Sequence, residues 1–130
     1  VYNSPLQIFS GNPSQGYLEP NFMELLGSIP TTWDTTIIVE AKVANYIITA
    51  RRKGEDWFIG GMTDWTARTF NLQLSFLSSG NYEATLCKDG VNADRYAADY
   101  SIKTFPVKKD DFIPVQMSPG GGFLIWLKKK

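Results

Sequence analysis

Residues 29–36 (IPTTWDTT) divide the chain into two parts with different hydrophobic patterns. Before them lie a short apolar segment, a loop rich in Gly, Asn, Pro and Ser, and one amphipathic stretch. After them the sequence runs almost entirely as short segments of period two. A strand and a helix alone have no core, so the first part is expected to be the end of something larger. The second part, about a hundred residues, has the size of one all-β domain.

The amphipathic stretch has the spacing of a single helix. Pro20 suits a first helical turn, and Gly27 and Pro30 supply stop signals. Its apolar residues recur at i, i+3, i+4 and i+7, and they are Phe22, Leu25, Leu26 and Ile29. Upstream, residues 4–9 fit a buried strand or an apolar loop, and residues 10–16 are expected to form a polar loop.

The period-two region predicts eight strands separated by turn signals. They cover residues 37–40, 46–53, 57–63, 69–76, 82–88, 101–107, 112–117 and 123–128. In the segment 69–76 the four apolar residues Phe70, Leu72, Leu74 and Phe76 all point to one face. The fold class is therefore all-β, an antiparallel β-sandwich of about eight strands preceded by a short strand, loop and helix.

Composition narrows the range of functions. The 130 residues contain 13 Lys and Arg against 13 Asp and Glu, so nothing favours nucleic acid as a partner. No apolar run is long enough for a membrane span, and no signal peptide is present in the sequence. There is no histidine, which excludes a His-based catalytic triad, and the single Cys87 excludes an internal disulfide.

The acidic pairs and glycine-rich turns predict no catalytic, cofactor-binding or metal-binding residue in this chain. Glu55-Asp56 and Asp110-Asp111 fall in expected hairpin loops, whereas glycosidic chemistry needs two carboxyl groups facing each other across a cleft. Residues 89–94 lack the ligand spacing of a calcium loop. Residues 119–122 lead into a strand, not into the helix N-terminus that a phosphate cradle needs.

The aromatic residues divide into expected core and expected surface. Trp57 and Trp126 lie among aliphatic residues within strands, which predicts core positions. Trp65 and Tyr96 fall in loops, and they are the candidate sugar-facing contact residues.

Several motifs, in order along the whole chain, carry a family resemblance. They are residues 30–34 (PTTWD), 50–64 (ARRKGEDWFIGGMTD), 88–95 (KDGVNADR) and 119–123 (PGGGF). Together they resemble the C-terminal portion of glycoside hydrolase family 97. Residues 1–30 resemble the end of that family's (β/α)8 catalytic barrel, and residues 31–130 resemble its C-terminal β-sandwich.

The resemblance implies a parent enzyme that is an α-glucosidase or α-galactosidase. It also implies a calcium ion in the catalytic barrel, with the catalytic acids and calcium ligands upstream of this chain. Export to the periplasm of a Gram-negative bacterium is expected on the same ground.

The leading functional hypothesis is a non-catalytic β-sandwich that buttresses its own catalytic barrel and mediates homo-oligomerisation. Carbohydrate is then a partner only through the parent enzyme. The candidate face towards the barrel or a second copy consists of Leu6, Ile8, Phe9, Phe22, Leu25, Leu26 and Ile29. The alternatives are an independent carbohydrate-binding module, which would show an exposed aromatic platform, and a generic adhesion-type sandwich.

Overall fold

The computed structural model describes residues 1, 2, 4, 6, 12–96 and 98–130, without the side chain of Gln15. This part of the chain contains two short helices, α1 (Pro13–Leu18) and α2 (Pro20–Gly27), followed by eight strands. The strands are β1 (Thr35–Lys42), β2 (Tyr46–Lys53), β3 (Asp56–Thr63), β4 (Arg68–Gln73), β5 (Asn81–Asp89), β6 (Tyr100–Lys108), β7 (Phe112–Met117) and β8 (Gly122–Lys129).

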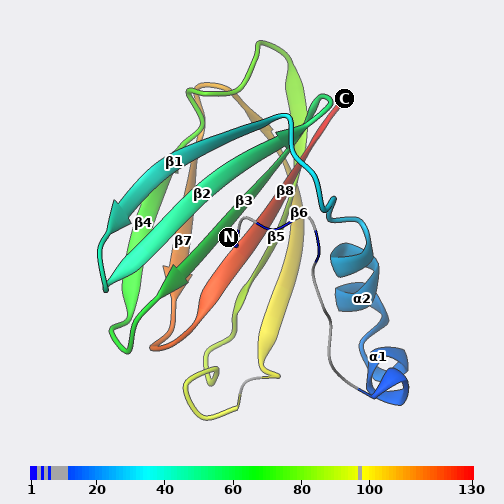
Figure 1. The fold of residues 1–130 in the computed structure, drawn as a ribbon, viewed down its shortest axis with the longest axis vertical. Coiled ribbons are helices and arrows are strands. Elements are labelled where there is room, and N and C mark those ends of the chain that lie inside the picture. The colour runs from blue at the N-terminus through cyan, green and yellow to red at the C-terminus, as the bar shows by residue number, and fades with distance from the viewer. Residues whose placement is uncertain (3, 5, 7–11, 97) are drawn as a thin grey trace.

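The strands form two sheets of unequal size. The large sheet has six strands in the order β1-β2-β3-β8-β5-β6, and the small sheet consists of β4 and β7. Every strand pair is antiparallel. Figure 1 shows the small sheet behind the large one, and α2 beside β6. The prediction of an antiparallel sandwich of about eight strands is confirmed.

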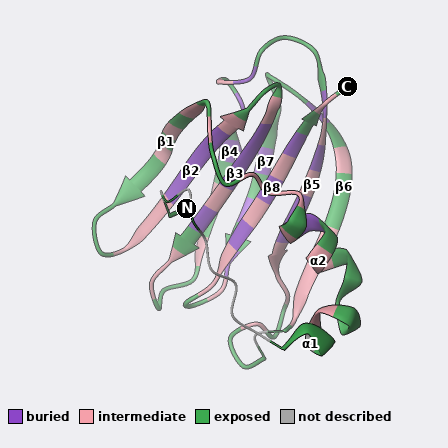
Figure 2. Ribbon diagram, turned by 45° about the vertical axis from the view of Figure 1, so that its right-hand side comes forward, coloured by how far each residue is buried: buried purple, intermediate pink, exposed green. Residues whose placement is uncertain are grey.

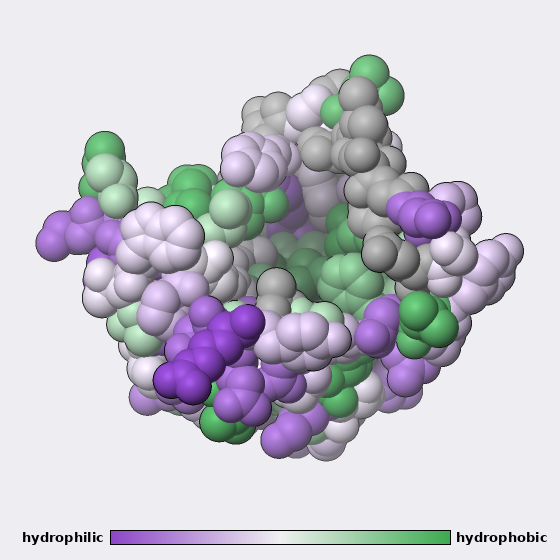
Figure 3. Space-filling model, turned by 90° about the horizontal axis from the view of Figure 1, so that it is seen from below, coloured by the Kyte–Doolittle hydropathy of each residue, from purple (hydrophilic) through white to green (hydrophobic). Residues whose placement is uncertain are grey.

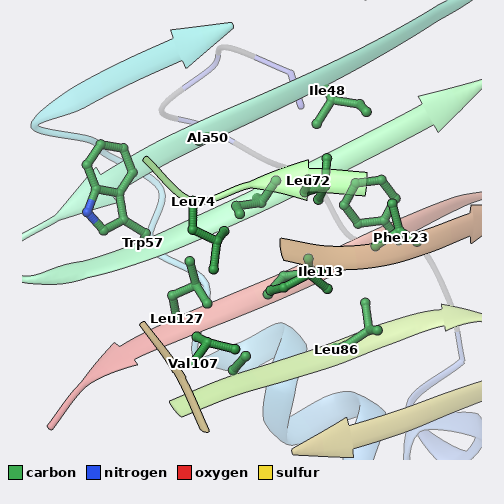
Figure 4. Packing of buried hydrophobic residues seen from close by; sticks show 14 of the residues in the cluster. Ile48, Ala50, Trp57, Leu72, Leu74, Leu86, Val107, Ile113, Phe123 and Leu127 are labelled. Atoms are coloured by element: carbon green, nitrogen blue, oxygen red, sulfur yellow. The ribbon is translucent and has the colours of Figure 1, made fainter. Parts of the chain in front are cut away.

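The core fills the space between the two sheets. It takes alternate residues of the central strands, as the purple bands along β2, β3, β8 and β5 show in Figure 2. Ile59 and Ile125, a register pair of β3 and β8, have no exposed surface. Leu72 and Ile113 of the small sheet point towards the same cluster (Figure 4). Each such side chain stabilises the fold by about 1.5–3 kcal/mol when fully buried.

The strand predicted over residues 69–76 is too long. β4 ends at Gln73, because the chain turns immediately afterwards and the Leu77 amide bonds to the Leu74 carbonyl. Leu74 is nevertheless fully buried, so it fills the core from a turn. Apolar alternation predicted its burial correctly but not its local conformation.

The polar loop predicted over residues 10–16 is also partly wrong, because residues 13–18 form α1. Asn12 caps this helix, since its side chain accepts a hydrogen bond from the Ser14 amide. Pro13 stands at the start of the helix, where its missing N–H costs nothing. α2 begins at Pro20 as expected and ends at Gly27, before Ile29.

Trp126 is not a core residue, which corrects the expectation for that tryptophan. Trp57 is buried in the core between the sheets, whereas Trp126 is half-buried on the opposite, outer face of the large sheet. The physical reason is the alternation of β8, where Ile125 and Leu127 take the inward positions.

Candidate interaction surfaces

An aromatic row crosses the outer face of the large sheet, the face turned away from β4 and β7. Phe58 of β3 is in register with Trp126 of β8, and their rings stack at 5.9 Å with an interplanar angle of 9°. Trp33, in the segment before β1, meets the Phe58 ring edge-on at 5.3 Å. Phe58 is buried although it lies outside the core cluster. The outer face is therefore a second apolar layer, covered in part by residues that precede β1.

Arg51 is the charged residue in this layer, and it is only 6% exposed. Its Nη1 donates to the Thr36 hydroxyl at 3.1 Å, and its Nη2 donates to the Val1 carbonyl at 3.1 Å. Its guanidinium lies 5.9 Å from the centroid of the Trp33 ring. A buried charge is tolerated only when it is hydrogen-bonded. Arg51 thus binds the N-terminal residue and the Trp33 segment to the sheet.

Helix α2 lies against the other end of the same outer face. Leu25 of the helix is buried, and the Phe22 ring packs on Tyr100 of β6 at 5.4 Å. The Tyr100 hydroxyl donates to the Glu19 carboxylate just before the helix. This hydrogen bond, with a smaller contribution from desolvation, raises the pKa of Tyr100 to about 12.

A cavity of about 430 Å³ lies between α2 and the strands β5, β6 and β8. Its walls are mainly apolar, and they include Phe22, Tyr100, Phe123, Leu124 and Cys87. Burial raises the pKa of the Cys87 thiol, with a further contribution from Asp89, so this thiol is held in its neutral form. Figure 3, seen from below, shows the hollowed end of the molecule with hydrophobic side chains inside the hollow.

The two predicted sugar-facing residues both lie in loops at that lower end. Trp65 is 86% exposed and its ring covers Gly120, which has a positive φ of 70°. Backbone hydrogen bonds from Asp64 to Asn45 and from Gly120 to Asp64 hold this loop to its neighbours. Tyr96 is 65% exposed in the loop between β5 and β6. Among the ring contacts of the described residues, none joins Trp65 to Tyr96.

The residues predicted as a barrel-facing or self-associating set have different environments. Leu6 is exposed, Leu25 is buried, and Phe22, Leu26 and Ile29 are half-buried. Ile8 and Phe9 lie outside the described residues. The structure therefore brings Phe22 and Leu25 together on the sheet-facing side of α2, and leaves Leu6 in solvent.

Three residues of the two acidic pairs, Glu55, Asp56 and Asp111, bond to neighbouring strands or turns. Asp56 accepts hydrogen bonds from Trp126 Nε1 and from the Lys129 amide, both at 3.3 Å. Glu55 pairs with the Lys129 ammonium at 3.5 Å. Asp111 accepts from the Lys108 amide at 2.7 Å.

Sequence reasoning missed the long-range role of Asp89. Its Oδ2 accepts from the amides of Ser118 at 2.9 Å and Gly122 at 3.1 Å, and it thereby fixes the turn between β7 and β8 to the end of β5. Arg51 was missed too. The sequence did contain a signal, because an arginine directly follows residues 47–50 (IITA), three of which are apolar, within a central strand.

No three His, Cys, Asp or Glu residues in the described part of the chain lie close enough together to hold a metal ion. Within the same residues, neither helix has the length and apolarity needed to cross a membrane.

The fold thus defines a β-sandwich domain with a short helical segment on its outer face. A protein-family model described as "Glycosyl-hydrolase 97 C-terminal, oligomerisation" matches residues 32–128. The chain belongs to this family, as its motifs predicted.

The chain is similar to two curated glycosidases. It is 45% identical over 128 residues to a retaining alpha-galactosidase of Bacteroides thetaiotaomicron. The aligned segment covers 98% of this chain and 19% of that protein. It is 31% identical over 123 residues to a probable retaining alpha-galactosidase of Streptomyces bingchenggensis, covering 95% and 18% respectively. The chain therefore spans about a fifth of the length of these relatives.

Among solved structures, the chain is similar to a glycoside hydrolase family 97 enzyme from Pseudoalteromonas sp. strain K8, determined in complex with acarbose. The TM-score is 0.87 at 31% identity, over 92% of this chain and 20% of that one. The matched part again corresponds to a small portion of a much longer protein.

Proposed function

We propose that this chain is the non-catalytic C-terminal β-sandwich of an α-glycosidase, which buttresses the catalytic part and mediates self-association. The observation that carries the first role is the apolar outer face of the large sheet, with its aromatic row and buried Arg51. The residues that come before the sandwich already lie on this face through Val1, Trp33 and α2. A catalytic part joined to residue 1 would be held next to it.

Self-association is supported by the description of the family itself, which names oligomerisation. Sedimentation velocity of the 130-residue chain over a range of concentrations tests this role. We expect a dimer or larger species that dissociates on dilution. A chain that stays monomeric at every concentration, alone and within the parent enzyme, would remove this part of the proposal.

The buttressing role is tested in the full-length parent. Phe58→Ala removes the centre of the aromatic row, so we expect the catalytic part to unfold at a lower temperature and to lose activity on heating sooner. Phe112→Ala, an exposed side chain of β7, is the matched control. Equal thermal inactivation of the two variants would argue against contact between this face and the catalytic part.

The parent activity that we propose is hydrolysis of α-galactosides or α-glucosides, supported by the two galactosidase relatives. The catalytic acids would lie in the other four-fifths of such a protein. We expect the isolated chain to release no aryl glycoside above the buffer rate. Turnover that disappears when an acid of this chain is mutated would overturn the proposal.

Calcium and export remain proposals from the family resemblance. Among the described residues, no three His, Cys, Asp or Glu side chains come together. We expect a calcium ion to be held by the catalytic part, as the family resemblance implies. Fractionation of the native cells tests the periplasmic location, and metal analysis of the parent with and without this chain tests where calcium binds.

An independent carbohydrate-binding module is the second candidate, and the exposed Trp65 is the observation in its favour. Titration of the chain with maltooligosaccharides and galactosides, followed by tryptophan fluorescence, distinguishes the two. Binding that is lost in Trp65→Ala would favour the module. We expect no change in fluorescence, because Trp65 has no ring contact with Tyr96 to form a platform.

A further inference from the structure

The edges of the two sheets differ in how they are protected against strand pairing. The large sheet ends at β1 and β6, and the small sheet ends at β4 and β7. An unprotected edge strand offers unpaired N–H and C=O groups to another chain. Proteins block such edges with prolines, lysines or bulges.

Three of the four edges carry such devices. β6 contains Pro106 together with Lys103 and Lys108, and β7 contains Pro114. β1 is interrupted by a bulge between Ile38 and Glu40. Each of these edges therefore resists extension by another strand.

β4 carries none of these devices. Its sequence RTFNLQ contains no proline and no lysine, and its pairing with β7 runs without a register shift. Its only charged residue, Arg68, is engaged within its own chain, by an ion pair with Asp64 at 3.4 Å and by stacking 4.9 Å from the Tyr46 ring centroid. No strand of the described part pairs with the other edge of β4.

The core is also incompletely covered near this edge. Ile37 and Val39 of β1 and Phe70 of β4 pack against the core cluster but are only half-buried. Phe70 is screened on one side by the Tyr46 ring at 5.0 Å. A second chain at this edge would remove part of this apolar surface from water, which favours association.

The outward face of the small sheet carries no charge. Its exposed residues are Thr69, Asn71, Gln73, Phe112, Pro114 and Gln116. When two β4 strands pair across a two-fold axis, the same outward side chains of both copies lie side by side, so charged residues there would have like charges as neighbours. A neutral face avoids that cost.

We propose that a second copy of this chain pairs with the free edge of β4, antiparallel and across a two-fold axis. The two small sheets then join into one sheet in the order β7-β4-β4-β7. This inference rests on the proposed self-association, and it adds the edge through which self-association occurs.

The first test places a lysine on the pairing edge. Thr69→Lys keeps an exposed position exposed but adds one positive charge to each copy beside the pairing edge. Since like charges at an interface repel, we expect the dissociation constant of the dimer to rise about tenfold or more. Gln116→Lys is the matched control, because Gln116 is the register partner of Thr69 on β7, one strand away from the edge.

The second test is cross-linking. Thr69, Asn71 and Gln73 are replaced by cysteine one at a time and in pairs, and the oxidised proteins are compared on non-reducing gels. At least one of these variants should give a covalent dimer, because Cα atoms of directly paired residues lie within disulfide range and the pairs cover each position of the two-fold axis along β4. Gln116→Cys and the native, buried Cys87 should not.

The outcomes separate the two proposals. The proposal that β4 is the pairing edge would be overturned if Thr69→Lys and Gln116→Lys affect self-association equally, or not at all, and the β4 cysteines give no covalent dimer. The proposed self-association itself would then still stand. A native chain that never associates would overturn both.

Discussion

The two outward faces of this sandwich differ in polarity, and therefore in the kind of contact that each can make. The outer face of the large sheet carries an aromatic row, a buried arginine and a covering segment from the start of the chain. The outward face of the small sheet carries neutral polar residues and one exposed phenylalanine. The first is an apolar layer suited to a permanent contact within one polypeptide. The second is suited to a surface that must also exist in water.

We expect the largest loss of stability from a substitution of Phe58, at the centre of the aromatic row. Phe58→Ala should lower the free energy of unfolding by about 3–5 kcal/mol, because it leaves a cavity beside the rings of Trp33 and Trp126. Urea denaturation of the 130-residue chain measures it. A loss of less than about 1 kcal/mol, the range of surface substitutions, would mean that this layer adds little beyond the core.

We expect the second-largest loss of stability from a substitution of Arg51. Arg51→Met keeps most of the side-chain volume but removes the hydrogen bonds to Thr36 and to the Val1 carbonyl. Leaving buried polar groups without partners costs about 1–3 kcal/mol, so urea denaturation should show a loss of that order. In Arg52→Met, the neighbouring and more exposed arginine on the opposite face, the loss should be smaller. Equal losses would contradict a special role for the buried guanidinium.

The contact between Tyr100 and Glu19 on the outer face of the large sheet should depend on pH. Its pKa is raised from 10.0 to about 12 by the hydrogen bond to Glu19, so the stabilisation that it supplies is fully present below pH 10. It is lost as the pH rises towards 12 and the phenol ionises. In a titration of tyrosinate absorbance, Tyr100→Phe should abolish the latest ionisation step. Tyr17→Phe, at an exposed position on α1, should leave that step in place.

Phe112 should give the smallest effect. It is 59% exposed on β7, so Phe112→Ala should change the free energy of unfolding by no more than about 0.5 kcal/mol. Urea denaturation of Phe112→Ala and Phe58→Ala under the same conditions measures the loss of stability on each of the two outward faces. A large loss in Phe112→Ala measured on dissociated chains would show that the small sheet depends on its outward residues for folding.

The sequence predicted the positions of the strands well, but it predicted poorly which face of the sheet each side chain lies on. Turn residues and period-two alternation located all eight strands within a few residues. Trp57 and Trp126 looked equivalent, because both lie among aliphatic residues. Only the structure separates them, since the central strands are apolar on both faces and alternation alone does not say which face meets the small sheet. The candidate contact residues Trp65 and Tyr96 were correctly placed in loops, but their separation depends on how those loops fold.

By itself, the amino-acid sequence determined the fold class, the helix that begins at Pro20 and, through its motifs, the family. These properties depend on neighbouring residues and on local hydrophobic period. Only the tertiary structure decided the strand order β1-β2-β3-β8-β5-β6, the role of Asp89 in fixing a distant turn, and the free edge of β4. Each of these brings together residues far apart in the chain, and no local pattern records which distant segments pair once the apolar surfaces are buried.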